Sequence, residues 1–165
     1  MRKLIGLVIV LVLILALFSS LTVMASAEVE EELFAIGIKF EQAFENGDLK
    51  TFEELFWHDE RLTVFWPDPN TAFRIDGWSQ FLQGYLKGMT YYLSQLPPGT
   101  VNFEIRQPSI NVMEDVAILT SYWILTMPTP EGGMAVSQGR ATFVCKKIEG
   151  KWVIIHAHAS TFPTP

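Results

Sequence analysis

Two histidines near the end of the chain have the types and spacing that could support chemistry. His156 and His158 occur in Lys151–Ser160, a run that follows the Glu149-Gly150 turn signal and alternates as a β-strand does. On that alternation Trp152 and Ile154 share a face with both histidines. Side chains at i and i+2 of a strand point the same way, so these imidazoles could form an acid–base pair or a two-histidine metal fork. The alternative is a hydrogen-bonded structural pair at a sheet or dimer surface.

A metal site at these histidines would need at least a third ligand. His58, Asp59, Glu60 and Asp68 are the plausible donors elsewhere in the sequence. Asp68 is also a candidate general base, although Pro67-Asp68-Pro69-Asn70 is foremost a turn signal. We expect neither a metal nor a cofactor, and His156, His158 and Asp68 are the catalytic candidates.

Four further residues are predicted to bind a ligand. Arg140 interrupts an apolar strand, where its guanidinium could grip a carboxylate or carbonyl, or form a structural salt bridge with Glu104 or Asp68. Tyr122 and Trp123 must point to opposite faces of their strand, and we expect Tyr122 to line the interior. The predicted ligand-binding set is Trp66, Tyr122, Arg140 and Thr142.

The elements that must position these residues are helices first and strands afterwards. Apolar residues at helical spacing predict helices from Leu33 to Asn46, from Leu49 to Phe56 and from Gly77 to Leu93. Gly47 is expected to end the first helix, and Asp48 to cap the second. A strand is expected at Leu62–Trp66 between the second and third helices. Five more strands are predicted after residue 100, at 101–106, 109–113, 116–127, 134–147 and 151–160. Turns are expected at Pro108 and at the three later junctions between these strands.

This order predicts an α+β fold. The run 116–123 is apolar on both faces and needs cover on each. We therefore expect a cone-shaped, curved antiparallel sheet wrapped around three N-terminal helices, with a ligand pocket inside the cone.

The first 27 residues are predicted to lie outside this fold. Arg2 and Lys3 precede an apolar run, and Ala25-Ser26-Ala27 matches a signal-peptidase site. An uncleaved membrane anchor at Leu4–Met24 is the alternative, because that stretch approaches the roughly 20 residues that a bilayer requires. Residues 28–165 then form one exported domain, either secreted or periplasmic, or tethered to a membrane.

Charge and cysteine content exclude other classes. Without Arg2 and Lys3 the chain has 10 basic and 18 acidic residues, a balance unsuited to nucleic-acid binding. The single cysteine, Cys145, allows no internal disulfide, and its strand position favours a small buried apolar side chain.

Four segments, in the right order, carry a family resemblance. They are Ala43–Leu49, Leu62–Phe65, Gly139–Val144 and Gly150–Ser160. Through them the chain resembles the nuclear transport factor 2-like superfamily, in particular its SnoaL-like branch. It is also similar to the association domain of calcium/calmodulin-dependent protein kinase II.

The resemblance implies a fold but no particular reaction. Its members include ketosteroid isomerase, scytalone dehydratase, polyketide cyclases and many non-enzymatic binding or assembly domains. The tyrosine that isomerase members carry on the first helix has no counterpart here, and the dehydratase spacing is not matched. We therefore expect a domain that binds a small, largely apolar molecule, and isomerase-, dehydratase- or cyclase-like proton transfer is the chemistry that the resemblance allows. The alternative is a non-catalytic homodimerising binding or assembly module.

Overall fold

The computed structural model describes residues 27–67 and 72–162. The chain divides into two compact units, Met1–Glu32 and Leu33–Pro165. In the first unit, residues 27–32 are described and are helical. The second unit contains the rest of this N-terminal helix, which runs through residue 46, and all the elements below. None of the helices described is both long and apolar enough to span a bilayer.

The junction between the first two helices forms as the sequence predicts. Gly47 has φ 61°, a left-handed conformation that favours glycine, and ends the N-terminal helix. Helix α2 (Leu49–Leu55) is capped by Asp48, whose carboxylate accepts hydrogen bonds from the Thr51 amide at 3.2 Å and hydroxyl at 2.6 Å. These hydrogen bonds lower the pKa of Asp48.

The third predicted helix is one continuous helical run with a wider turn in its middle. It consists of α3 (Trp78–Phe81), a π-helical turn (Leu82–Leu86) and α4 (Lys87–Ser94). Phe81 and Leu86 are both buried although they are five residues apart. The π turn brings residues at that spacing onto one face, which is why the run departs from the regular spacing of an α-helix.

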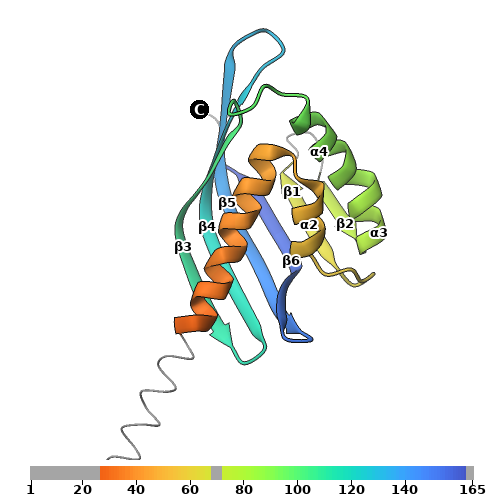
Figure 1. Cartoon of the computed structure of the whole chain (residues 1–165), viewed down its shortest axis with the longest axis vertical. Helices are drawn as coiled ribbons and strands as arrows, with labels where there is room; N and C mark the ends of the chain where they lie inside the picture. The colour runs from red at the N-terminus through yellow and green to blue at the C-terminus, as the bar shows by residue number, and fades with distance from the viewer. Residues whose placement is uncertain (1–26, 68–71, 163–165) are drawn as a thin grey trace, which may run out of the picture. The chain divides into compact units, whose positions relative to one another are not determined.

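The strands form one six-stranded sheet in the order β2-β1-β6-β5-β4-β3. Neighbouring strands are antiparallel except for the parallel pair of β1 and β6. The strand bounds are β1 Thr63–Pro67, β2 Ala72–Asp76, β3 Asn102–Met113, β4 Val116–Pro128, β5 Met134–Ile148 and β6 Lys151–Thr161. Figure 1 shows the helices on one side of this sheet. The predicted α+β class and the helix-covered sheet are confirmed.

Two strand predictions are wrong. Strand β2 was not expected, because only a turn was predicted from Pro67–Asn70. The residues after that turn form a short strand that pairs with β1. Residues 101–113 were expected as two strands joined at Pro108. They form the single edge strand β3 instead, with an irregular register between Arg106 and Ser109. An edge strand can absorb a proline at such a bulge because no neighbour requires its missing N–H.

Aromatic side chains fill the centre of the space between helices and sheet. Phe40 of the N-terminal helix is 1% exposed, and its ring lies 5.0 Å from Phe143 of β5 and 5.3 Å from Phe52 of α2, centroid to centroid. Cys145 is also fully buried, as predicted, and burial raises the pKa of its thiol to about 12. The described interior is therefore packed with aromatic rings around Phe40.

A β-bulge in β6 determines which of its side chains point to the inner face of the sheet and which point to the outer face. On β6, Ile154 pairs with Cys145 and His156 pairs with Val144, so Ile155 has no partner. The extra residue reverses the alternation. Ile154 and then Ala157 are buried on the inner, helix-covered face, whereas His156 and His158 lie on the uncovered outer face. The expected sharing of one face by Trp152, Ile154 and the two histidines is wrong for this reason.

Candidate functional site

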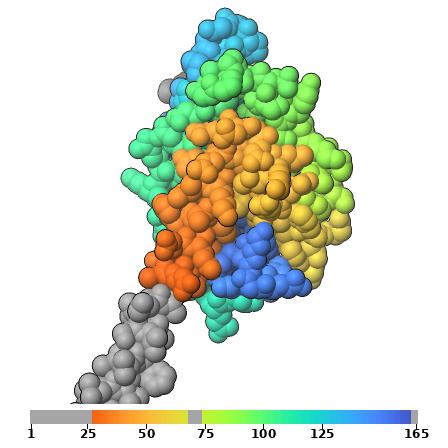
Figure 2. All heavy atoms as spheres, in the orientation of Figure 1, coloured from red at the N-terminus to blue at the C-terminus, as the bar shows by residue number. Residues whose placement is uncertain are grey.

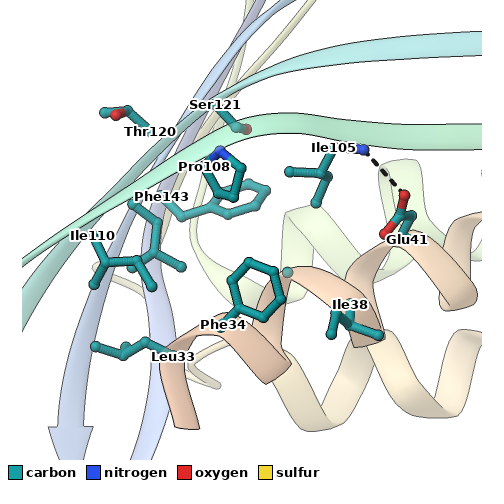
Figure 3. A pocket seen from close by; sticks show the side chains of 12 residues that line it. Leu33, Phe34, Ile38, Glu41, Ile105, Pro108, Ile110, Thr120, Ser121 and Phe143 are labelled. Atoms are coloured by element: carbon teal, nitrogen blue, oxygen red, sulfur yellow. Dashed lines mark hydrogen bonds between the residues drawn. The ribbon is translucent and has the colours of Figure 1, made fainter. Parts of the chain in front are cut away.

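The described residues enclose a cavity of about 110 Å³ between the N-terminal helix and strands β3 to β5. Figure 3 shows side chains from these elements converging on it. The helix contributes Leu33, Phe34, Gly37, Ile38 and Glu41. The sheet contributes Ile105, Pro108 and Ile110 of β3, Leu119, Thr120 and Ser121 of β4, and Phe143 of β5. Its walls are almost entirely apolar.

Two local features leave this space unfilled. Gly37 has no side chain where the helix faces β3, and a Cβ there would lie 3.6 Å from Cδ1 of Ile105. The irregular register of β3 places Pro108 beside the same space. Gln107, the residue before it in this bulge, has φ 49°. A helix glycine opposite a strand bulge leaves a gap beside the phenylalanine core, which borders it through Phe143.

The cavity opens at the edge of the sheet. Phe34 and Ile38 line it and are 48% and 42% exposed, so their side chains form an accessible rim. Figure 2 shows this side of the molecule, with the N-terminal helix lying beside the edge strand β3. A small molecule can therefore reach the cavity without displacing the buried core.

Glu41 and Glu45 hold the helix against the edge strand. Glu41 Oε1 accepts a hydrogen bond from the Ile105 amide, and Glu45 Oε1 accepts one from the Phe103 amide, each at 3.1 Å. These bonds satisfy N–H groups that an edge strand otherwise exposes. Glu41 lines the cavity, whereas Glu45 does not. Glu41 is thus the one ionisable group among the described lining residues.

The two histidines lie away from this cavity. On the outer sheet face, His156 Nδ1 lies 2.6 Å from the Thr63 hydroxyl, and the Phe65 ring lies 5.9 Å from His156 and 5.8 Å from His158. Partial burial and then the charge of His158 lower the pKa of His156. The histidines are adjacent as predicted, but no described pocket joins them. Their catalytic role stays a prediction.

The outer face also carries three of the four predicted ligand-binding residues. Tyr122 is 47% exposed and Trp123 is buried instead, so the expectation that Tyr122 lines the interior is wrong. Arg140 pairs with Tyr122 across the strands, and Thr142 pairs with His158. The Arg140 guanidinium lies 5.3 Å from the centre of the Phe162 ring.

The alternative for Arg140 was a structural salt bridge with Glu104 or Asp68, and Glu104 pairs with Arg106 instead. None of the three outer-face residues lines the cavity. Whether they bind a ligand stays a prediction.

Trp66 is the predicted ligand residue that does face the helices. Its ring lies 6.0 Å from Phe40 and 5.6 Å from Tyr85, so it packs in the core. Burial raises the pKa of Tyr85. Asp68 lies outside the described residues. Within the described ranges no three His, Cys, Asp or Glu side chains gather as a metal site.

Sequence reasoning missed Glu41 and Gly37. Glu41 reads as one of several solvated helix glutamates, and only its contact with Ile105 distinguishes it. Gly37 did carry a signal, because a glycine in the interior of an otherwise strong helix often has a packing reason. Pro108 inside a strand pattern was a second signal, since it marks an edge strand or a bulge.

Comparisons with known proteins point to one fold family. A model of the SnoaL-like domain matches residues 36–165. No curated protein matches the sequence. Several solved structures are similar at low sequence identity.

A nuclear transport factor 2-like superfamily protein from Salmonella enterica serovar Typhimurium is 19% identical. That match covers 84% of this chain and 94% of the other, with a TM-score of 0.69. A proposed dehydratase of the NTF2-like family from Streptomyces avermitilis is 16% identical, with 81% and 96% covered and a TM-score of 0.65. The association domain of calcium/calmodulin-dependent protein kinase II from C. elegans is 20% identical, with 82% and 97% covered and a TM-score of 0.61. At these identities the likeness concerns the fold.

Proposed function

Because this chain belongs to the SnoaL-like domain family, we propose that it binds a small, largely apolar molecule in the cavity beside its N-terminal helix. The observation that carries the proposal is the cavity itself, whose apolar walls lie behind an accessible rim of Phe34 and Ile38. Its size of about 110 Å³ is comparable with engineered apolar cavities of about 150 Å³ that bind benzene.

The proposal is one of binding without assigned catalysis. Proton transfer of the isomerase, dehydratase or cyclase kind requires an acid or base within reach of the ligand. His156 and His158 lie on the opposite face of the sheet, and Asp68 lies outside the described residues. Glu41 alone among the described lining residues could exchange a proton.

Filling the cavity provides the test. Gly37→Leu places a branched side chain where Gly37 now faces Ile105, and we expect it to weaken binding of the neutral probe toluene at least about tenfold. Gly88→Leu is the matched control, because a Cβ at Gly88 meets nothing within 4 Å. Ligand-observed NMR titration measures both. Toluene that binds Gly37→Leu as well as the unchanged protein would contradict the proposal.

A second candidate function, self-association through the outer sheet face, rests on a separate observation. Large apolar side chains are exposed on that face, on which no described helix packs. They are Phe65 of β1, Met113 of β3, Tyr122 of β4, and Met134 and Val136 of β5. Exposed apolar surface of this kind marks association sites. One structural neighbour is itself an association domain.

We expect the protein to be a homodimer at micromolar concentration, and Tyr122→Glu to weaken the dimer at least about tenfold. A charge in place of a half-exposed aromatic on this face cannot be buried without cost. Tyr91→Glu on α4 is the control, because Tyr91 is exposed on a helix away from the sheet. Analytical ultracentrifugation gives the dissociation constants. An unchanged protein that sediments as a monomer throughout excludes this function.

We also propose that the domain is exported from the cytoplasm. Arg2 and Lys3, the apolar run after them and Ala25-Ser26-Ala27 support a signal peptide of 27 residues, although residues 1–26 lie outside the described ones. Leu4–Met24, if uncleaved, would tether the domain to a membrane. N-terminal sequencing of cell fractions decides: a start at Glu28 supports cleavage, and a start at Met1 in the membrane supports the tether. A start at Met1 in the cytoplasm contradicts export.

A further inference from the structure

The position of Glu41 gives the cavity a chemical preference. A carboxylate offers several lone-pair directions, and it can only accept hydrogen bonds. Glu41 Oε1 accepts the Ile105 amide, and within the described residues no protein donor bonds Oε2. Glu45, one helical turn later, bonds Phe103 in the same way but lies outside the cavity lining.

No described cation balances the Glu41 charge at the cavity. Lysine, arginine and histidine are absent from the described lining. Arg106 is the nearest basic residue along β3, but it is engaged by Glu104. The other walls are apolar and supply no donors besides the hydroxyls of Thr120 and Ser121. A negative charge beside an apolar wall attracts donors and repels anions more strongly than it would in open water.

We propose that the cavity selects small apolar molecules that carry one O–H or N–H group, and that it rejects anions such as carboxylates. The apolar body occupies the space between Gly37, Ile105 and Phe143, and the donor bonds the free oxygen of Glu41. The size of about 110 Å³ admits a single six-membered ring or a short branched chain. This inference rests on the proposed ligand-binding function and adds the class of ligand to it.

Three ring compounds of similar size test the preference on the full-length protein. Toluene offers no donor, phenol offers one O–H, and benzoate carries a negative charge. A hydrogen bond to a charged acceptor predicts that phenol binds at least about tenfold more tightly than toluene. Benzoate is expected to bind at least about tenfold more weakly than toluene. Ligand-observed NMR titration in one buffer gives all three affinities.

Two matched variants attribute the preference to one carboxylate. Glu41→Gln keeps the shape and an acceptor for the Ile105 amide but removes the charge. We expect it to bring the affinities for phenol and toluene to within about threefold of each other and to strengthen benzoate binding, although the cost of burying a carboxylate remains. Glu45→Gln makes the same change of charge one turn away, and we expect it to leave the order phenol, toluene, benzoate unchanged.

The outcomes separate this inference from the function on which it rests. Equal binding of phenol and toluene to the unchanged protein, or tighter binding of benzoate, overturns the selectivity and leaves apolar binding intact. A preference for phenol that survives in Glu41→Gln also overturns it. Absence of binding by all three probes overturns both the selectivity and the proposed function.

Discussion

Replacing Phe40 with alanine is expected to lower the free energy of unfolding by about 3 to 5 kcal/mol. Phe40 is 1% exposed and joins the N-terminal helix to α2 and β5 through its contacts with Phe52 and Phe143. Removing the ring takes away apolar contact with every layer at once and leaves a cavity that the rigid sheet cannot close. Urea denaturation followed by tryptophan fluorescence measures the loss.

Phe34→Ala on the same helix serves as the control. Phe34 is already half-exposed at the cavity rim, so its truncation is expected to cost less than about 1 kcal/mol. If the two variants lose the same stability, Phe40 is not the centre of the core.

Gly139→Ala is expected to be about as damaging, for the opposite reason. A Cβ at Gly139 would lie 1.8 Å from the Ser160 carbonyl oxygen and 2.7 Å from the Trp123 ring. The first neighbour is backbone in the adjacent strand β6, so it cannot rotate away, and the β5–β6 pairing must shift. Overpacking usually costs about 1 to 3 kcal/mol, and a backbone collision lies at or above the upper end. The same denaturation experiment measures the effect.

Gly88→Ala is the matched comparison for this substitution. Gly88 lies in α4, and an added Cβ meets nothing within 4 Å. Alanine there should raise stability by about 0.5 to 1 kcal/mol, because glycine is a poor helix former. Equal stability of Gly139→Ala and the unchanged protein would show that β5 and β6 are not held as closely as described.

The packing at the centre of the domain separates its two proposed surfaces. Aromatic rings fill the middle of the interior around Phe40. What remains is a side cavity between the N-terminal helix and β3, and an outer face with exposed aromatic residues. The proposed ligand binding and the proposed self-association therefore involve opposite sides of one sheet, and we expect a substitution at one to leave the other unchanged.

The predicted site residues show where local patterns stop being informative. His156 and His158 are adjacent as the i, i+2 rule requires, yet Ile155 is a bulged residue, and it moves them to the face opposite Ile154. A bulge depends on the register with β5, which the sequence of β6 alone does not contain. The strand pattern places the side chains of Tyr122 and Trp123 on opposite faces of β4. Which of the two faces inward depends on the side of the sheet that the helices cover.

The amino-acid sequence by itself determined the three helices, the strands after them apart from β2 and the undivided β3, the Asp48 cap and the burial of Cys145. These follow from spacing, capping and turn chemistry, which act over a few residues. Only the tertiary structure decided that Gly37, Pro108 and Glu41 meet at one cavity and that the histidines lie outside it. These three residues are separated by many positions in the chain, and they meet because helix packing and a bulged edge strand bring distant segments together. Their meeting at the cavity depends on how whole helices and strands pack together, and a local sequence pattern does not predict this packing.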